Sequence, residues 1–266
     1  MASTNREVIA LHIGQAGVQL GQSCLELLAL EHGLDKEGIP LLGRKAVMPN
    51  GFYSFFEEGA SGKYVPRSIF VDLDPTVIDD LKAGEFGNMV SPHSLVRGKE
   101  DAASNFARGR YTIGKDILDT TLDVFRRLVE KCGSLQGFVL LHSIGGGCGS
   151  GFTTLLLDHI LSDFGMKKNI LDFCVFPSEA SLCVVEPYNA VLSAPSLIEN
   201  TNVTFPYDNQ TVGTCLFEFY SVIYCQFEDL FLLSYTHSHR HTYPHRHTHP
   251  HARTHTHKSS TSAVHI

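Results

Sequence analysis

The densest chemical signal in the sequence is a glycine-rich segment, residues 145–151 (GGGCGSG). Five of its seven residues are glycine, so the backbone can approach a ligand closely and direct several N–H groups at one spot. An apolar segment precedes it and a helical pattern follows it, which is typical of a phosphate site at a helix start. No Gly-Lys-Ser/Thr triplet follows, so this is not a Walker A loop. The alternative interpretation is a flexible turn.

A second glycine-containing turn follows the first apolar segment of the chain. Gly14 and Gln15 stand at the start of a helical pattern that also contains Gly17 and Gly21. The turn offers a second helix N-terminus to the same ligand. Close packing of a helix on a sheet explains Gly17 and Gly21 equally well, so this signal is weak alone.

Acidic residues end another apolar segment. Asp72 and Asp74 come directly after it, where carboxylates can hold Mg²⁺ opposite a phosphate. Asp74 also precedes Pro75, so capping of a helix is the alternative. Residues 98–105 (GKEDAASN) are polar and precede a further helix, and their pattern does not separate ligand binding from capping.

Cys148, inside the glycine-rich segment, allows a different chemistry. A cysteine at a helix start has a lowered pKa and can act as a nucleophile. The sequence places no particular histidine beside it, so phosphate binding is favoured. The seven cysteines show no CxxC pair and no regular spacing, which indicates reduced, buried thiols rather than a disulfide framework.

The elements that must position these residues alternate between strand and helix. Apolar, β-branched runs predict strands at residues 7–13, 68–73, 137–142, 170–176 and 203–205. Helical spacing predicts helices at residues 15–31, 114–131, 152–164 and 186–198, with another beginning at Pro75. Residues 33–66, rich in Gly, Pro and charge, are predicted to be a long loop. The pattern predicts an α/β fold, a doubly wound parallel sheet with its ligand at the carboxyl ends of the strands.

Composition excludes several classes of protein. With 266 residues and 43% hydrophobic residues, the chain can bury a sizeable core as one large or two small domains. Its formal net charge of -7 disfavours a nucleic-acid partner. Residues 211–235 are a possible membrane segment, but Glu218, Glu228 and Asp229 interrupt its apolar run well short of the roughly 20 residues that span a bilayer. Neither a membrane segment nor a secretory signal is therefore expected.

The strand–helix pattern stops near residue 210. The remaining stretch, 211–266, contains ten of the 15 histidines and a low-complexity run rich in His and Thr that cannot build a core. We expect a domain over residues 1–210 followed by a disordered tail over 211–266. Alternating Thr and His is also what a repeated CA tract encodes. Metal binding by the histidines lacks any fixed geometry.

Several segments resemble the tubulin family, and its α-tubulins in particular. The glycine-rich GGGCGSG is close to the family pattern GGGTGSG. REVIALHIGQAGVQLG, VPRSIFVDLDPTVID, GKEDAASNFARGRYTIG, LQGFVLLHSIGGGCGSGF and VVEPYNAVL resemble α-tubulin segments. The resemblance covers about residues 5–210 and implies a Rossmann-like tubulin/FtsZ GTPase domain that is incomplete at its C-terminal side.

The resemblance implies a site for GTP and Mg²⁺ at positions matching the family motifs: Gln15, Asp74, Asp101, Ala102, Ser143, Gly146, Gly147, Cys148, Gly149, Glu186 and Asn209. Gln15 would contact phosphate and Mg²⁺, and Asp74 stands where the family has a metal-side Glu. Asp101 and Ala102 would line the γ-phosphate. Ser143 and the glycine segment would hold the α- and β-phosphates, Glu186 the ribose and Asn209 the guanine.

This sequence departs from the family pattern at several of these positions. Cys148 replaces a Thr, and a thiol is a weaker hydrogen-bond donor than a hydroxyl, so lower nucleotide affinity is expected. Ser104 stands where α-tubulin has Asn. Residues 177–182 form a loop one residue shorter than in the family, and Leu182 falls where a Thr that contacts ribose is expected. A guanine-stacking aromatic and a second guanine-reading Asn would lie beyond residue 210, where the resemblance ends.

At the level of function, the resemblance implies a GTP-binding structural constituent of microtubules in the cytoplasmic cytoskeleton. Its partners would be β-tubulin, in a heterodimer, and other tubulin subunits. In the family, the acidic residue that activates GTP hydrolysis on the neighbouring subunit lies beyond the matching region, so no catalytic residue is assigned. A free-standing nucleotide hydrolase is less favoured. The alternative is a truncated or mispredicted tubulin fragment without polymer function.

Overall fold

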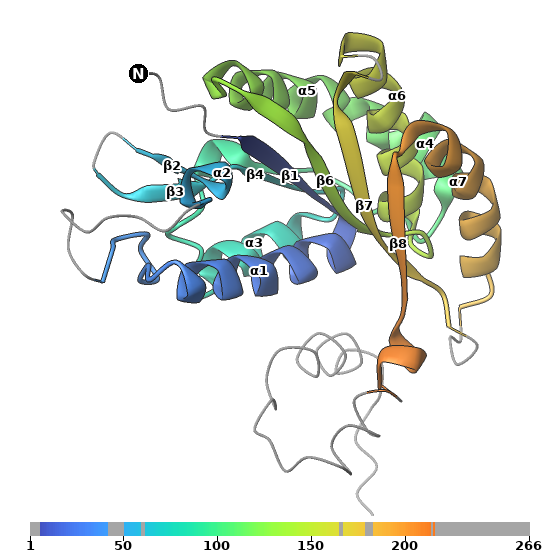
Figure 1. The fold of residues 1–266 in the computed structure, drawn as a ribbon. Helices are drawn as coiled ribbons and strands as arrows, with labels where there is room; N and C mark the ends of the chain where they lie inside the picture. Colours follow the sequence, from blue (N-terminus) through green and yellow to red (C-terminus); the bar gives the residue numbers. More distant parts are fainter. Residues whose placement is uncertain are drawn as a thin grey trace, which may run out of the picture.

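A six-stranded parallel sheet forms the centre of the computed structural model, which describes residues 6–41, 51–59, 62–164, 167–178, 183–213 and 215. The strand order is β5-β4-β1-β6-β7-β8, and every neighbouring pair runs parallel (Figure 1). The strands are β1 (Glu7–Ile13), β4 (Ser68–Asp72), β5 (Leu95–Arg97), β6 (Leu135–Ser143), β7 (Asn169–Phe176) and β8 (Val203–Asp208). The predicted parallel sheet is confirmed.

Helices cover both faces of this sheet, as a doubly wound fold requires (Figure 1). One face carries α1 (Gly14–Glu31) and α3 (Pro75–Ala83), and the other carries α4 (Phe106–Tyr111), α5 (Ile113–Lys131), α6 (Thr153–Phe164) and α7 (Glu186–Asn200). A π-helical turn, Cys148–Phe152, leads into α6, and a 3₁₀ turn, Pro92–Ser94, leads into β5.

Two apolar clusters, one on each face, hold the layers together. Side chains of β1, β4, β6 and β7 pack against α5 and α6 in the larger cluster, with Phe125, Phe138 and Phe152 among its fully buried members. The smaller cluster joins Phe70 on β4 to α1 and α3. All five residues of β4 are buried, which explains its nearly continuous apolar run.

The prediction of a long loop over residues 33–66 was wrong for part of that range. The structure contains a short helix, α2 (Phe52–Phe55), and an antiparallel pair, β2 (Phe56–Glu58) with β3 (Tyr64–Pro66). Phe52, Phe56 and Tyr64 are buried in the smaller apolar cluster. These aromatic side chains form structure because α1 and β4 supply the surface that they bury, which a local composition count does not detect.

The sheet ends at β8, which is twice as long as the predicted strand 203–205. Among the described strands, β8 pairs only with β7, and Pro206 is tolerated there because an edge strand can lack one donor. Val203, Phe205 and Tyr207 are exposed along this strand. Residues 211–266, apart from 211–213 and 215, lie outside the described residues, as does Leu182.

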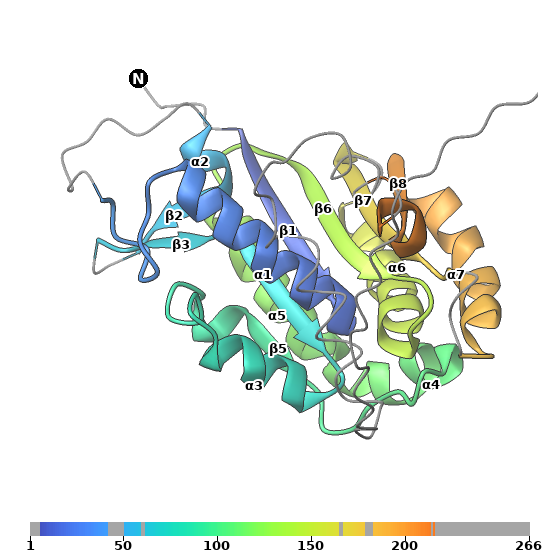
Figure 2. The ribbon, with the colours of Figure 1, turned by 90° about the horizontal axis from the view of Figure 1, so that it is seen from below.

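A view from below shows α1 crossing the sheet beneath β1 (Figure 2). A cavity of about 380 Å³ lies between α1 and the strands β1, β6, β7 and β8, and it extends to Arg67 and Ser68 at the start of β4. Its lining is mostly apolar and includes Leu20, Leu141, Phe173 and Tyr207, with Asn209 at the end of β8. In the described part of the chain, no helix combines the length and apolar character needed to cross a membrane.

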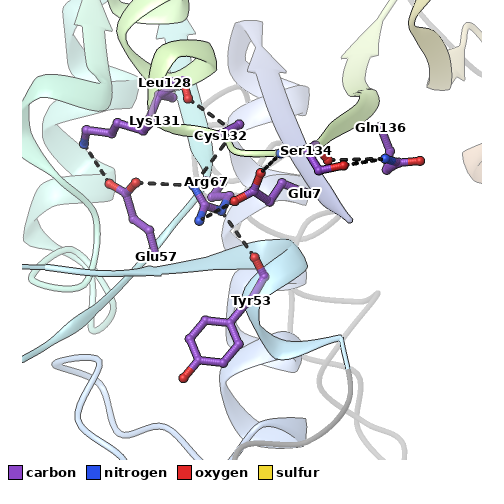
Figure 3. Close-up of polar contacts among 9 residues, drawn as sticks. All are labelled: Glu7, Tyr53, Glu57, Arg67, Leu128, Lys131, Cys132, Ser134 and Gln136. Carbon is purple, nitrogen blue, oxygen red and sulfur yellow. Dashed lines mark hydrogen bonds and ion pairs between the residues drawn. The ribbon is translucent and has the colours of Figure 1, made fainter. Parts of the chain in front are cut away.

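The amino edge of the sheet is tied together by a buried arginine (Figure 3). Arg67, 8% exposed, pairs with Glu7 at 3.3 Å and with Glu57 at 3.4 Å. Glu7 also accepts a 2.7 Å hydrogen bond from the backbone N–H of Ser134, and Lys131 pairs with Glu57 at 2.8 Å. The network links β1, β2, α5 and the start of β6 to the residue that precedes β4.

Candidate functional site

The polar loops predicted to form a site lie together at the carboxyl edge of the sheet. Because all six strands are parallel, the turns that follow β1, β4, β5, β6 and β7 leave the sheet at this one edge. The glycine-rich segment 145–151, called the glycine loop below, lies between β6 and α6 and contacts turns from all four of the other strands.

The glycines of this loop differ in how closely other parts of the chain approach them. A Cβ on Gly147 would lie 2.5 Å from the backbone N of Asn105, and one on Gly149 would lie 2.3 Å from the carbonyl O of Ser143. Gly151 is equally close to the carbonyl O of Phe106. These three glycines are therefore required by backbone packing. A Cβ on Gly146 would meet no atom within 4 Å, so the loop is open there, where a ligand could approach.

The loop passes directly into a wide helical turn. The π-helical turn from Cys148 continues into α6, and the first turn of such a helix leaves backbone N–H groups without partners inside the helix. Ser150 closes the turn by donating its backbone N–H to the carbonyl O of Gly146 at 3.2 Å. Ser143 Oγ donates to the carbonyl O of Val175 and accepts from the N–H of Gly145, both at 3.2 Å. The Ser143 side chain and the Ser150 backbone N–H thus hold the loop in this conformation.

Cys148 does not have the environment of a nucleophile. Its side chain is buried, and burial followed by the nearby Asp72 carboxyl raises its thiol pKa well above the ordinary value. The disfavoured alternative, a nucleophile with a lowered pKa at the helix start, is therefore contradicted, because desolvation and an adjacent acidic group outweigh the helix terminus. A thiol that keeps its proton serves as a neutral, weak donor at this position.

Asp72 is the most perturbed acid of the edge. It is 3% exposed, and burial raises its pKa to about 7, although the backbone N–H of Asp74 and the thiol of Cys148 donate to it and partly oppose that shift. A cation beside it would favour the ionised form.

Asp74 caps helix α3, as the alternative interpretation stated. Its Oδ1 accepts a 2.9 Å hydrogen bond from the N–H of Thr76, and Oδ2 is left for solvent or a cation. Gln15, the second residue of α1, and Asp101 both have exposed side chains at this edge. Oxygen donors of this kind are the ligands that Mg²⁺ takes from proteins, often through water. The donor set therefore fits Mg²⁺ without showing it.

A strained turn follows β5 and faces the glycine loop. Ala102 is fully buried, and a Cβ on Gly147 would lie 2.9 Å from its Cβ. Ala103 and Ser104 have φ angles of 48° and 52°, a left-handed conformation that costs non-glycine residues free energy. Asn105 then caps α4 by accepting from the N–H groups of Ala107 and Arg108. The turn is held because it packs directly on the glycine loop.

Asn189 is a key residue that the sequence analysis did not assign. It is buried on α7, and its Nδ2 donates to the carbonyl O of Gly145 at 2.7 Å and to that of Ser104 at 2.8 Å. Its Oδ1 accepts from the N–H of Phe106 at 3.1 Å. One amide on α7 thus joins the glycine loop to the turn between β5 and α4. The available signal was an amide one turn after Glu186 in a segment singled out as family-like.

A buried histidine beneath the loop was also missed. His142, the residue before Ser143 on β6, is fully buried, and its Nδ1 lies 2.7 Å from the carbonyl O of Gly149. Its Nε2 lies 2.9 Å from Oδ1 of Asp172, which is also fully buried. Cys174 completes this group on β7. No local motif marks these residues, because the register of β6 against β7 brings them together.

The last two predicted site residues differ in how closely they approach the loop. Glu186 starts α7 beside the loop, since a Cβ on Gly145 would lie 3.2 Å from its Cγ. Asn209 follows β8 at the same edge, is exposed and borders the cavity under β7 and β8. Among the described residues, no hydrogen bond joins Asn209 to the glycine loop. The predicted residues therefore all lie at the carboxyl edge, and Asn209 borders the cavity there.

Comparisons with known proteins match the domain that carries this edge to a family model and to individual relatives. The family model "Tubulin/FtsZ family, GTPase domain" matches residues 7–215. A tubulin alpha chain of Dictyostelium discoideum is 51% identical over 214 residues, which are 78% of this chain and 47% of that protein. A tubulin alpha-2 chain of Emericella nidulans is 54% identical over 77% of this chain and 46% of its own length. The chain spans about half the length of the curated relatives it matches.

Proposed function

The chain belongs to the Tubulin/FtsZ family through its GTPase domain, and from this we propose that it is an α-tubulin-like, GTP-binding constituent of microtubules. The observation that carries the proposal is the glycine loop between β6 and α6, which is open at Gly146 and lies inside the matched region. Identities near 50% to alpha tubulins support the α-type assignment.

The nucleotide would act as a bound part of the fold. In this proposal the backbone N–H groups of Gly146, Gly147 and Gly149 hold the phosphates, with Ser143 ordering the loop. Asp74 and Gln15 supply oxygen donors for Mg²⁺, and Asp101 and Ala102 border the terminal phosphate. Glu186 takes the ribose and Asn209 the guanine. A ligand that binds only the folded state stabilises that state.

Partners and location follow from the same assignment. We propose β-tubulin as the heterodimer partner, with assembly into cytoskeletal microtubules in the cytoplasm. The sheet domain over residues 1–210 would carry nucleotide and contacts, and residues 211–266 would form a separate tail. No residue of this chain is proposed as a catalytic base for GTP hydrolysis.

The test is to express the full 266-residue chain and measure guanine nucleotide released from the soluble, monodisperse fraction on denaturation. About one GTP or GDP per chain is expected from single-site binding. Gly146→Ala, which places a methyl group in the open part of the loop, should lower that occupancy. Gly133→Ala is the matched control at the opposite edge, where a Cβ would meet only Glu7 Oε2, at 4.0 Å. A well-folded chain without nucleotide would contradict the proposal.

The variant Cys148→Thr tests whether residue 148 contributes to phosphate binding. A hydroxyl donates a stronger hydrogen bond than a thiol, so GDP affinity should rise by about two- to tenfold, the worth of one ordinary hydrogen bond. Titration of nucleotide-stripped protein with GDP measures this. Equal affinity in both proteins would mean that residue 148 does not contact phosphate.

A further inference from the structure

The ion pair between His142 and Asp172 lies where a core of this kind is normally apolar. Both side chains are fully buried between the sheet and α6, and Nε2 of His142 lies 2.9 Å from Oδ1 of Asp172. Their backbone positions are fixed by the parallel register, in which His142 pairs with Cys174 and Leu140 pairs with Asp172. Neither side chain reaches the surface on which a nucleotide would bind.

The same imidazole reaches up to the glycine loop. Its Nδ1 lies 2.7 Å from the carbonyl O of Gly149, and because a carbonyl only accepts, Nδ1 must carry a proton and donate it. His142 therefore connects a carboxyl group in the core to one peptide of the loop. Burial lowers the pKa of His142, whereas Cys174 and Asp172 raise it, and its pKa lies above the ordinary value. A proton on both ring nitrogens suits both contacts.

Stability alone does not account for this pair. Removing two polar groups from water is costly, and replacing a buried ion pair with apolar residues of similar size is often neutral or stabilising. In the described part of the chain, neither carboxyl oxygen of Asp172 has a hydrogen-bond partner, and its contact with His142 is an ion pair. The pair also contacts Gly149, so support of the glycine loop, rather than stability, explains its presence in the core.

Gly149 is the point at which three elements meet. A Cβ on it would lie 2.3 Å from the carbonyl O of Ser143, and a Cβ on Gly14 would lie 3.0 Å from the N of Gly149. His142 turns the Gly149 carbonyl into the core, beneath the wide turn of Cys148–Phe152. The N–H groups at the start of a helix point in the opposite direction to its carbonyls, so this contact aims them out of the core.

We infer that His142, held by Asp172, is a positioning residue that aims the glycine loop at the phosphates of the bound nucleotide. This inference rests on the proposed function, because it names the residues that preorganise the proposed nucleotide site. Its phosphate specificity follows from geometry, since the pair supports the loop and contacts neither the ribose side at Glu186 nor the guanine side at Asn209.

Two double variants of the full chain test it. His142→Asn with Asp172→Asn keeps a donor at the Nδ1 position and removes the charge. His142→Leu with Asp172→Leu removes both the donor and the ion pair. Should the double-leucine chain not fold, His142→Gln with Asp172→Asn replaces it, because a glutamine amide occupies the Nε2 position and does not reach Gly149. The measurements are the dissociation constants for GDP and for guanosine, with the urea midpoint as the stability readout.

The expected result is a loss confined to phosphate recognition. The variant lacking the donor should bind GDP about tenfold more weakly while its guanosine affinity stays near wild type, and the urea midpoint verifies that the protein compared is folded. The double-asparagine variant should remain within about threefold for GDP. Unchanged GDP affinity without the donor, or equal losses for GDP and guanosine, would overturn the inference. A folded wild-type chain that binds no GDP would overturn the proposed function itself.

Discussion

The two edges of the parallel sheet differ in how the polar groups at the ends of the strands are satisfied. At the amino edge, charged side chains satisfy one another: Arg67 lies between Glu7 and Glu57, and the pairs are closed inside the protein (Figure 3). At the carboxyl edge, the glycine loop presents backbone groups, and buried side chains such as Asn189 and His142 brace it from within. At the first edge the charged groups are paired with one another, whereas the second edge has open space beside Gly146.

The comparison indicates that the groups that stabilise the fold and the groups available for binding lie at opposite edges of the sheet. Charges that are already paired add little to recognition, while preorganised N–H groups can bind an anion without first breaking an internal pair. Changes in the Arg67 network should therefore alter unfolding more than affinity, and changes in the groups that brace the glycine loop should alter affinity as well.

The largest effect is expected from Arg67→Met at the amino edge. It leaves the Glu7 carboxylate buried without its partner, so the free energy of unfolding should fall by about 3–5 kcal/mol. Urea denaturation measures this, and GDP affinity of the folded fraction should not change. Lys36→Met is the control, because its pair with Glu85 is exposed and should contribute less than about 1 kcal/mol. A small effect of Arg67→Met would remove the contrast between the edges.

Asn189→Leu should affect both stability and binding at the carboxyl edge. It leaves the carbonyls of Gly145 and Ser104 and the N–H of Phe106 without partners, at a cost of about 2–3 kcal/mol. GDP affinity should fall as well, because the glycine loop loses a brace. Asn200→Leu, a half-buried position at the other end of the same helix, is the control and should leave affinity unchanged.

The pH dependence of stability should reveal Asp72. Its pKa of about 7 in the folded chain lies above the unfolded value of 3.8, so the native state holds the extra proton between these values. The contribution of Asp72 to stability is therefore largest below its folded pKa and is lost as pH rises through that value, by about 2–3 kcal/mol between pH 5 and pH 8. Urea titrations without nucleotide or Mg²⁺ test this. Asp72→Asn should flatten the dependence, and Asp79→Asn, exposed on α3, should not.

The smallest effect is expected from Ser104→Asn. Ser104 has φ of 52°, and asparagine adopts this left-handed conformation at lower cost than serine, so stability should rise by about 0.5 kcal/mol. Thermal unfolding measures the shift. Ser91→Asn, at an ordinary φ of -63°, is the control. A destabilised Ser104→Asn chain would show that contacts of the side chain outweigh backbone strain.

Much of the fold was predictable because its signals are local. The apolar runs at β1, β4, β6 and β7 and the periodicity of α5 are each contained within one element. The glycine loop was recognisable for the same reason, since seven consecutive residues define it. The pair β2–β3 was missed because Phe56 and Tyr64 become ordered only against surfaces supplied by α1 and β4.

The sequence by itself determined the alternating α/β architecture, the family and the position of the glycine loop, since periodicity and short motifs depend on neighbours along the chain. Tertiary structure alone decided which glycine is open and which are packed, and it raised the thiol pKa of Cys148 by burial beside Asp72. It also paired His142 with Asp172, 30 positions later, through the register of β6 on β7. Burial and close approach are properties of three-dimensional packing, and no local pattern records them.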